Sequence, residues 1–180
     1  MAEDPISSAC REMEVSTEGC ALLHPGMAPQ AAVRALLAGG LTQDALKLLA
    51  RLLPRRYAVA WLCQCAREQP LPPEDKAGAA LAERWLRDPS ESNRRAAYAF
   101  ASAGGYASPG AWLAAAVGWS GGSLAPADQA VPATPGPDLT ARAAVAAVNL
   151  LAAVDPQRFD ARRRGFAAHA LELLVGSHGA

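Results

Sequence analysis

Cysteines are the most reactive side chains in this chain of 180 residues, and two of the four, Cys63 and Cys65, form a C-x-C pair. Such a pair suggests zinc or redox chemistry, because thiolates bind zinc and can join as a disulfide. On a helix, however, residues two apart point about 200° away from each other, so these thiols neither share a metal easily nor bond to one another. We therefore expect buried, reduced thiols at Cys63 and Cys65, and free thiols at Cys10 and Cys20.

Histidines and glycines offer little further chemistry. His24, His169 and His178 are scattered along the chain, so a metal site would need ligands from distant segments, and we predict neither a metal nor a cofactor. The glycines of SGGS, residues 120–123, suggest a phosphate-binding loop, but no lysine follows them. A turn that ends the preceding helix is the better interpretation.

The charge balance argues against two classes of partner. Lysine plus arginine equals aspartate plus glutamate at 17 each, so the net charge is zero. A neutral protein has no global field that attracts nucleic acid or anionic lipid. We therefore interpret the clusters Arg94–Arg95 and Arg162–Arg164 as solvated or salt-bridged helical faces. We expect no nucleic-acid and no membrane partner.

Trp119 precedes an unusual segment. It lies at the predicted end of a helix that also carries Trp112, just before a proline- and glycine-rich connection over residues 120–138. Connections of that length inside compact domains are usually functional or disordered, and tryptophan concentrates binding energy at protein interfaces. Core packing of each tryptophan is the alternative. The predicted partner-binding residues are Trp112, Trp119, Ser120, Gly121, Gly122, Ser123 and Leu124.

Two predicted helices are apolar on almost every side. One spans residues 52–68 and includes Trp61, and the other spans residues 140–154. A helix of this kind must lie inside the protein, covered by other helices. The longest apolar run of the chain, residues 143–154, lies in the second of these helices. It is shorter than the roughly 20 residues that a membrane span needs.

The elements together predict an all-α protein. Proline and glycine punctuate about eight helices, and no segment alternates with the period of a strand. We expect a single globular bundle over residues 29–176, built around the two apolar helices and interrupted by the loop at about 120–138. Residues 1–28 are predicted to be a flexible lead-in. A short helical-repeat solenoid is the alternative, although no fixed repeat period is visible.

Four segments together resemble an uncharacterised bacterial helical family that is encoded in type VI secretion gene clusters. They are residues 52–67 (LLPRRYAVAWLCQCAR), 85–101 (WLRDPSESNRRAAYAFA), 118–126 (GWSGGSLAP) and 138–153 (DLTARAAVAAVNLLAA). The members are small cytoplasmic proteins found near PAAR-domain effectors and the chaperones that load them. The resemblance implies a non-enzymatic co-chaperone or adaptor that binds an effector's chaperone or the effector itself. No active-site residue carries over.

Two alternatives to this function remain. The first is an immunity protein against a neighbouring toxin, which the neutral charge mildly disfavours because such proteins use charge to speed capture. The second is an enzyme that uses Cys63, Cys65 or dispersed polar residues in a helical cleft.

The N-terminus has early acidic residues and lacks the apolar core of a secretory signal, so we expect a cytoplasmic protein.

Overall fold

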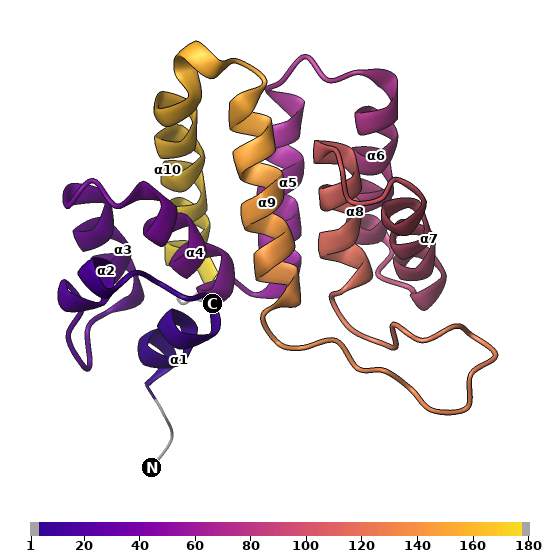
Figure 1. Cartoon of the computed structure of the whole chain (residues 1–180), viewed down its shortest axis with the longest axis horizontal. Coiled ribbons are helices and arrows are strands. Elements are labelled where there is room, and N and C mark those ends of the chain that lie inside the picture. The colour runs from indigo at the N-terminus through magenta and orange to yellow at the C-terminus, as the bar shows by residue number, and fades with distance from the viewer. Residues whose placement is uncertain (1–3, 178–180) are drawn as a thin grey trace.

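The computed structural model describes residues 4–177, which form ten α-helices and one short 3-10 helix, with no strand among them (Figure 1). The all-α bundle predicted from the sequence is therefore confirmed. The helices are α1 Pro5–Glu12, α2 Thr17–Ala21, α3 Pro29–Ala38, α4 Thr42–Leu52, α5 Arg55–Arg67, α6 Pro73–Arg87, α7 Glu91–Ala103, α8 Pro109–Gly118, α9 Leu139–Ala153 and α10 Phe159–Ser177, and η1 (Pro156–Arg158) precedes α10.

Local sequence explains most helix starts. Proline occupies the first turn of α1, α3, α6 and α8, where its missing N–H costs nothing. The hydroxyls of Ser90 and Ser108 cap α7 and α8 by accepting the backbone N–H groups of Asn93 and Ala111. These signals are local, which is why the helices from α3 onward follow the predicted segments.

The helices are arranged as a bundle rather than a solenoid. Helices α5, α9 and α10 lie side by side, with α6, α7 and α8 on one side and α1 to α4 on the other (Figure 1). Helix α10 returns to contact α3 and α4, and α5 contacts α9, although these elements are far apart in sequence. In a solenoid each repeat would contact only its neighbours.

Three helices, rather than the predicted two, form the centre. Helices α5 and α9 are central as expected, but α5 is not covered all round, because Tyr57 is 40% exposed. The third is α8, in which every residue except Pro109 and Trp112 is buried. Its sequence is mostly glycine and alanine, and small side chains let the neighbouring helices approach closely.

The contact between α6 and α8 depends on two glycines. A Cβ atom on Gly78 would lie 2.2 Å from the carbonyl oxygen of Gly110, and one on Gly110 would lie 2.5 Å from the Cα of Asp75. The carboxylate of Asp75 is buried and accepts the N–H of Gly110 at 2.8 Å. This bond satisfies an otherwise unpaired N–H at the start of α8.

Trp61 anchors α5 inside the bundle. Its side chain is fully buried, and its indole N–H donates to the carbonyl oxygen of Phe166 on α10 at 2.8 Å. A buried indole usually needs such a partner, because leaving its donor unpaired is costly. The predicted hub helix is thus joined to the last helix of the chain.

The structure differs from the sequence expectation over residues 4–28, where two helices replace the predicted irregular lead-in. Helix α1 packs on α4, and the hydroxyl of Ser16, just before α2, donates to the buried carboxylate of Asp44. The apolar residues of α1 and its C-cap follow the helical spacing i, i+3, i+4, i+7, but over too short a stretch to stand out. They are Ile6, Ala9, Cys10 and Met13, all buried.

The apolar run over residues 143–154 belongs to α9, where most side chains are covered by other helices. Within residues 4–177, no single helix combines the length and apolar character needed to cross a membrane. Helix α9 and the segment from Pro156 to Gly176 reach that length and composition only as a pair bent by 114°.

Candidate functional site

The two predicted tryptophans meet in one aromatic cluster, which we define as Tyr106, Trp112 and Trp119. The ring centroids of Trp112 and Trp119 are 5.8 Å apart, and Tyr106 lies 5.6 Å from Trp112 and 5.4 Å from Trp119. Trp112 lies on α8 and Trp119 directly follows it as the C-cap residue, so their separation of seven residues, about two helical turns, places both rings on the same side. All three rings are half-buried and pack against the core, so core packing, the alternative for Trp112 and Trp119, accounts for part of each ring, and the rest stays accessible.

Tyr106 was missed from the sequence. It lies in the turn between α7 and α8 and has a positive φ of 54°, which is uncommon for a tyrosine. Its N–H donates to the carbonyl oxygen of Ala101, and its hydroxyl lies 3.1 Å from the hydroxyl of Ser102. The preceding Gly104–Gly105 pair signals a turn, but nothing local indicates that the ring folds back along α8.

Arg94 holds the start of the loop after α8. Its guanidinium is buried and donates to the carbonyl oxygens of Gly118 and Ser123, the latter at 2.9 Å. It also pairs with both carboxylate oxygens of Glu91, and this hydrogen bonding lowers the pKa of Glu91. The Arg94–Arg95 cluster is therefore salt-bridged, as predicted, and Arg94 positions the predicted binding residues.

Other contacts complete this attachment. Arg55 donates to the carbonyl oxygen of Ser120 at 2.9 Å, and Arg95 donates to that of Ala125 at 3.2 Å. Gly122 has a φ of +62°, and a Cβ atom there would lie 2.8 Å from Nε of Arg94. The SGGS turn thus presents carbonyl oxygens to arginines, whereas a phosphate-binding loop presents N–H groups to an anion.

The rest of the loop closes on itself and projects from the helices (Figure 1). The N–H of Leu124 donates to the carbonyl oxygen of Ala133 at 2.8 Å, and the hydroxyl of Ser123 accepts the N–H groups of Ala125 and Ala133. Residues 126–134 are exposed, and Val131 is the most exposed large apolar side chain described, at 71%. Val131 was not among the predicted contact residues.

Residues 118–122, GWSGG, have the G-x-S-x-G spacing at which α/β-hydrolases hold a nucleophilic serine. In those enzymes the serine lies between a strand and a helix, beside a histidine. Here Ser120 follows a helix and enters an irregular loop. The two described histidines lie elsewhere, with His24 in the N-terminal segment and His169 at 3.7 Å from Glu68.

The C-x-C pair is embedded in the core. Both Cys63 and Cys65 are free and buried, as predicted. Burial raises the pKa of Cys63 to about 12 and that of Cys65 further. A thiol reacts as its thiolate, so these two are poorly suited to nucleophilic chemistry at neutral pH.

The remaining predicted polar residues are dispersed. Arg162 lies 3.8 Å from Asp155, and Arg163 lies 3.7 Å from Asp160 and over the ring of Phe159. Residues 4–177 contain no group of three histidine, cysteine or acidic side chains arranged to hold a metal ion. His178 lies outside the described residues.

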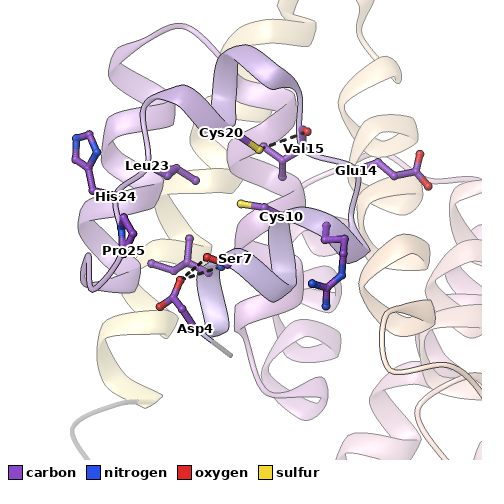
Figure 2. Close-up of a pocket in the computed structure, with 11 residues that line it drawn as sticks. Asp4, Ser7, Cys10, Glu14, Val15, Cys20, Leu23, His24 and Pro25 are labelled. Atoms are coloured by element: carbon purple, nitrogen blue, oxygen red, sulfur yellow. Dashed lines mark hydrogen bonds between the residues drawn. The ribbon is translucent and has the colours of Figure 1, made fainter. Parts of the chain in front are cut away.

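A cavity of about 460 Å³ opens between α1, α2 and the segment that follows them (Figure 2). Cys10 and Cys20 lie on its wall, with Asp4, Ser7 and His24 among the other lining residues. Sequence spacing did not suggest this site, because it forms only when the two short helices fold over α4.

Comparison with known proteins identifies one family. DUF6931, described as a family of unknown function, matches residues 32–174. The match extends from within α3 to α10 and includes the aromatic cluster and the loop, whereas α1 and α2 lie outside it. No curated protein and no solved structure matches the chain.

Proposed function

Since the chain belongs to the DUF6931 family, whose function is unknown, we propose from its own surface that it is a non-enzymatic protein-docking module. The docking surface consists of the aromatic cluster and residues 120–134 of the loop. The observation that carries the proposal is that three aromatic rings lie half-exposed beside a projecting loop whose start is held by buried Arg94.

Aromatic rings suit this role because they bury a large area at little entropic cost. Trp112 and Trp119 hold one another and Tyr106 in place, so their ordering cost is already met in the free protein. The exposed tip around Val131 offers an apolar contact that nothing else in the fold requires. The docking surface therefore combines preorganised aromatic rings with an exposed loop tip.

The resemblance to proteins of type VI secretion clusters supplies the partner class for this proposal. The module acts as a co-chaperone or adaptor that helps to load an effector by binding the effector's chaperone or a PAAR-type effector itself. Such a role needs a stable protein surface and no catalytic group.

Purification of the tagged chain from its native host tests the proposal. We expect an effector chaperone or effector to co-purify, and the reconstituted pair to bind measurably by calorimetry. Replacement of Trp119 by Ala should weaken binding about tenfold or more, because the variant removes the largest contact at the centre of the surface. Replacement of the exposed Val131 by Asp should weaken it without affecting the fold.

Tyr57→Ala is the matched control, since Tyr57 is an exposed aromatic on α5 outside the aromatic cluster. It should leave the affinity unchanged. Equal losses in all three variants, or full binding by Trp119→Ala and Val131→Asp, would place docking elsewhere. A chain that purifies alone would contradict the co-chaperone role.

Deletion of the gene separates this role from immunity. Loss of effector export with normal growth supports the co-chaperone, whereas self-intoxication relieved by the wild-type chain supports an immunity protein.

A further inference from the structure

Cys10 and Cys20 lie next to each other on the wall of the N-terminal cavity (Figure 2). They come from different helices, α1 and α2, and the neighbouring Cys20 adds to the effect of burial in raising the pKa of Cys10. Cys10 is buried, with 9% of its surface exposed, whereas Cys20 is exposed. Two thiols therefore lie on one cavity wall, and solvent reaches that of Cys20 directly.

We propose that Cys10 and Cys20 form a redox modification site, at which a hydroperoxide converts the two thiols into an intramolecular disulfide. Nothing in the proposed docking function requires this site. It lies outside the span that matches the family, in the segment whose helices cover α4.

The two thiols have different roles in the reaction. The sulfur of Cys20 attacks one oxygen of the hydroperoxide and breaks the O–O bond, and the departing alkoxide or hydroxide takes the thiol proton. The product is a sulfenic acid on Cys20 and an alcohol or water. The sulfur of Cys10 then attacks the sulfenic sulfur, and the hydroxyl group leaves as water with the proton of Cys10. The sulfurs lose two electrons, which reduce the peroxide.

Exposure determines this order. The Cys20 thiol is accessible, and it donates weakly to the carbonyl oxygen of Val15 at 3.7 Å. Burial, with smaller contributions from Cys20, Asp4 and Asp44, raises the pKa of Cys10 to about 11. Cys10 is thus a poor first nucleophile, but it is held beside the sulfur that it must attack.

The product would connect α1 to α2 covalently. Helix α1 packs on α4, and Ser16, between α1 and α2, is hydrogen-bonded to Asp44 of α4. A bond between Cys10 and Cys20 would close this part of the chain over α4 and restrict its unfolded states, which raises the thermal midpoint of unfolding.

Peptide mapping after oxidation tests the proposal. The purified full chain is treated with a small excess of hydrogen peroxide at neutral pH, and the remaining thiols are alkylated under denaturing conditions. Trypsin cleaves after Arg11, so the expected disulfide joins peptides 1–11 and 12–34. Cys63 and Cys65 share peptide 57–67 and serve as an internal control. We expect Cys20 to be consumed at least about tenfold faster than either, because both are buried.

Two variants separate the roles. Cys10→Ser should accumulate a sulfenic acid on Cys20 that dimedone captures, and Cys20→Ser should leave Cys10 reduced. Far-UV circular dichroism checks that each variant keeps its helices. Absence of the link in the wild-type chain, a link between two chains, or unchanged oxidation of Cys10 in Cys20→Ser would overturn the proposal.

Discussion

Individual side chains hold this fold together through contacts between segments far apart in sequence. Trp61 is the clearest case, because its indole N–H bonds to Phe166 across 105 positions of the chain. Arg94 is a second, because one buried guanidinium joins α7 to both the end of α8 and the loop. In both cases the buried polar group is tolerated because it is hydrogen-bonded to the backbone of another element.

Replacement of Trp61 by Phe should lower the free energy of unfolding by about 2–4 kcal/mol, through the lost hydrogen bond and the space left by the smaller ring. Urea denaturation followed by circular dichroism measures the change. The control is Trp112→Phe, because Trp112 is half-buried and the bond to Phe166 is made by Trp61. Equal effects at both positions would contradict the assigned role of Trp61.

Replacement of Arg94 by Gln should lower the free energy of unfolding by about 1–3 kcal/mol, because the buried carbonyl of Gly118 loses its charged donor. Arg95→Gln, which affects a more exposed guanidinium on the same helix, should cost less. Urea midpoints compare the two variants, and a larger loss in Arg95→Gln would be inconsistent with the structure.

The same contact makes stability depend on pH. The pKa of Glu91 in the folded chain lies below its ordinary value of 4.5, chiefly because Arg94 donates hydrogen bonds to it. Its contribution is therefore complete above pH 4.5 and is lost as the pH falls through the lower folded pKa. Urea midpoints between pH 6 and 3 should fall less steeply in Glu91→Gln than in the wild-type chain. Identical slopes would argue against this pair.

At the scale of elements, small residues decide which helices become central. Helix α8 has only ten residues, yet it contacts α6, α7 and α9, because glycine and alanine allow their backbones to come close. The aromatic cluster follows from the same arrangement. Neighbouring helices cover most of α8, and the side that they leave accessible carries Trp112 and leads to Trp119.

Two glycine-to-alanine variants test this packing. Gly78→Ala should lower the free energy of unfolding by at least about 2 kcal/mol, because the added Cβ meets the backbone of Gly110. Gly165→Ala is the matched control within α10, where an added Cβ meets nothing within 4 Å, and it should stabilise the chain by about 0.5–1 kcal/mol. Chemical denaturation measures both, and opposite signs are the expected result.

At the scale of the whole molecule, the N-terminal helices form part of the core rather than an appendage. Ile6, Ala9 and Met13 are each at most 3% exposed, and they extend the same hydrophobic cluster as the central helices. Burial of these side chains stabilises the fold roughly in proportion to the apolar surface area that it removes from water.

Removal of residues 1–28 should therefore lower the free energy of unfolding by about 3–6 kcal/mol, the contribution expected for burying two large apolar side chains, Ile6 and Met13. Thermal and urea denaturation measure the loss, and increased binding of a hydrophobic dye would report the uncovered surface of α4. An unchanged midpoint would support the flexible lead-in predicted from the sequence instead.

Much of the fold could be predicted from the sequence. Proline, glycine and apolar spacing indicate the helices from α3 onward, and the apolar segments around Trp61 and residues 140–154 identify two of the three central helices. Helix α1 was missed because eight residues give too short a pattern. The central position of α8 was missed because its alanines pack on every side without forming a stripe. Of the candidate site, Trp112, Trp119 and the start of the loop were predicted from the sequence, whereas Tyr106 and Arg94 were not connected with it.

The cysteines separate what local helical geometry determines from what tertiary packing determines. The sequence by itself determined that Cys63 and Cys65 are separated, because helical geometry acts between close neighbours and turns adjacent thiols apart. Only the tertiary structure brought Cys10 and Cys20 together, since their distance depends on how α1 and α2 fold over α4. In the aromatic cluster, helical spacing places Trp112 and Trp119 on one side, and only the tertiary structure shows Tyr106 beside them. Helix formation is a local property of this chain, whereas the meeting of reactive or binding side chains depends on how separate elements pack against one another.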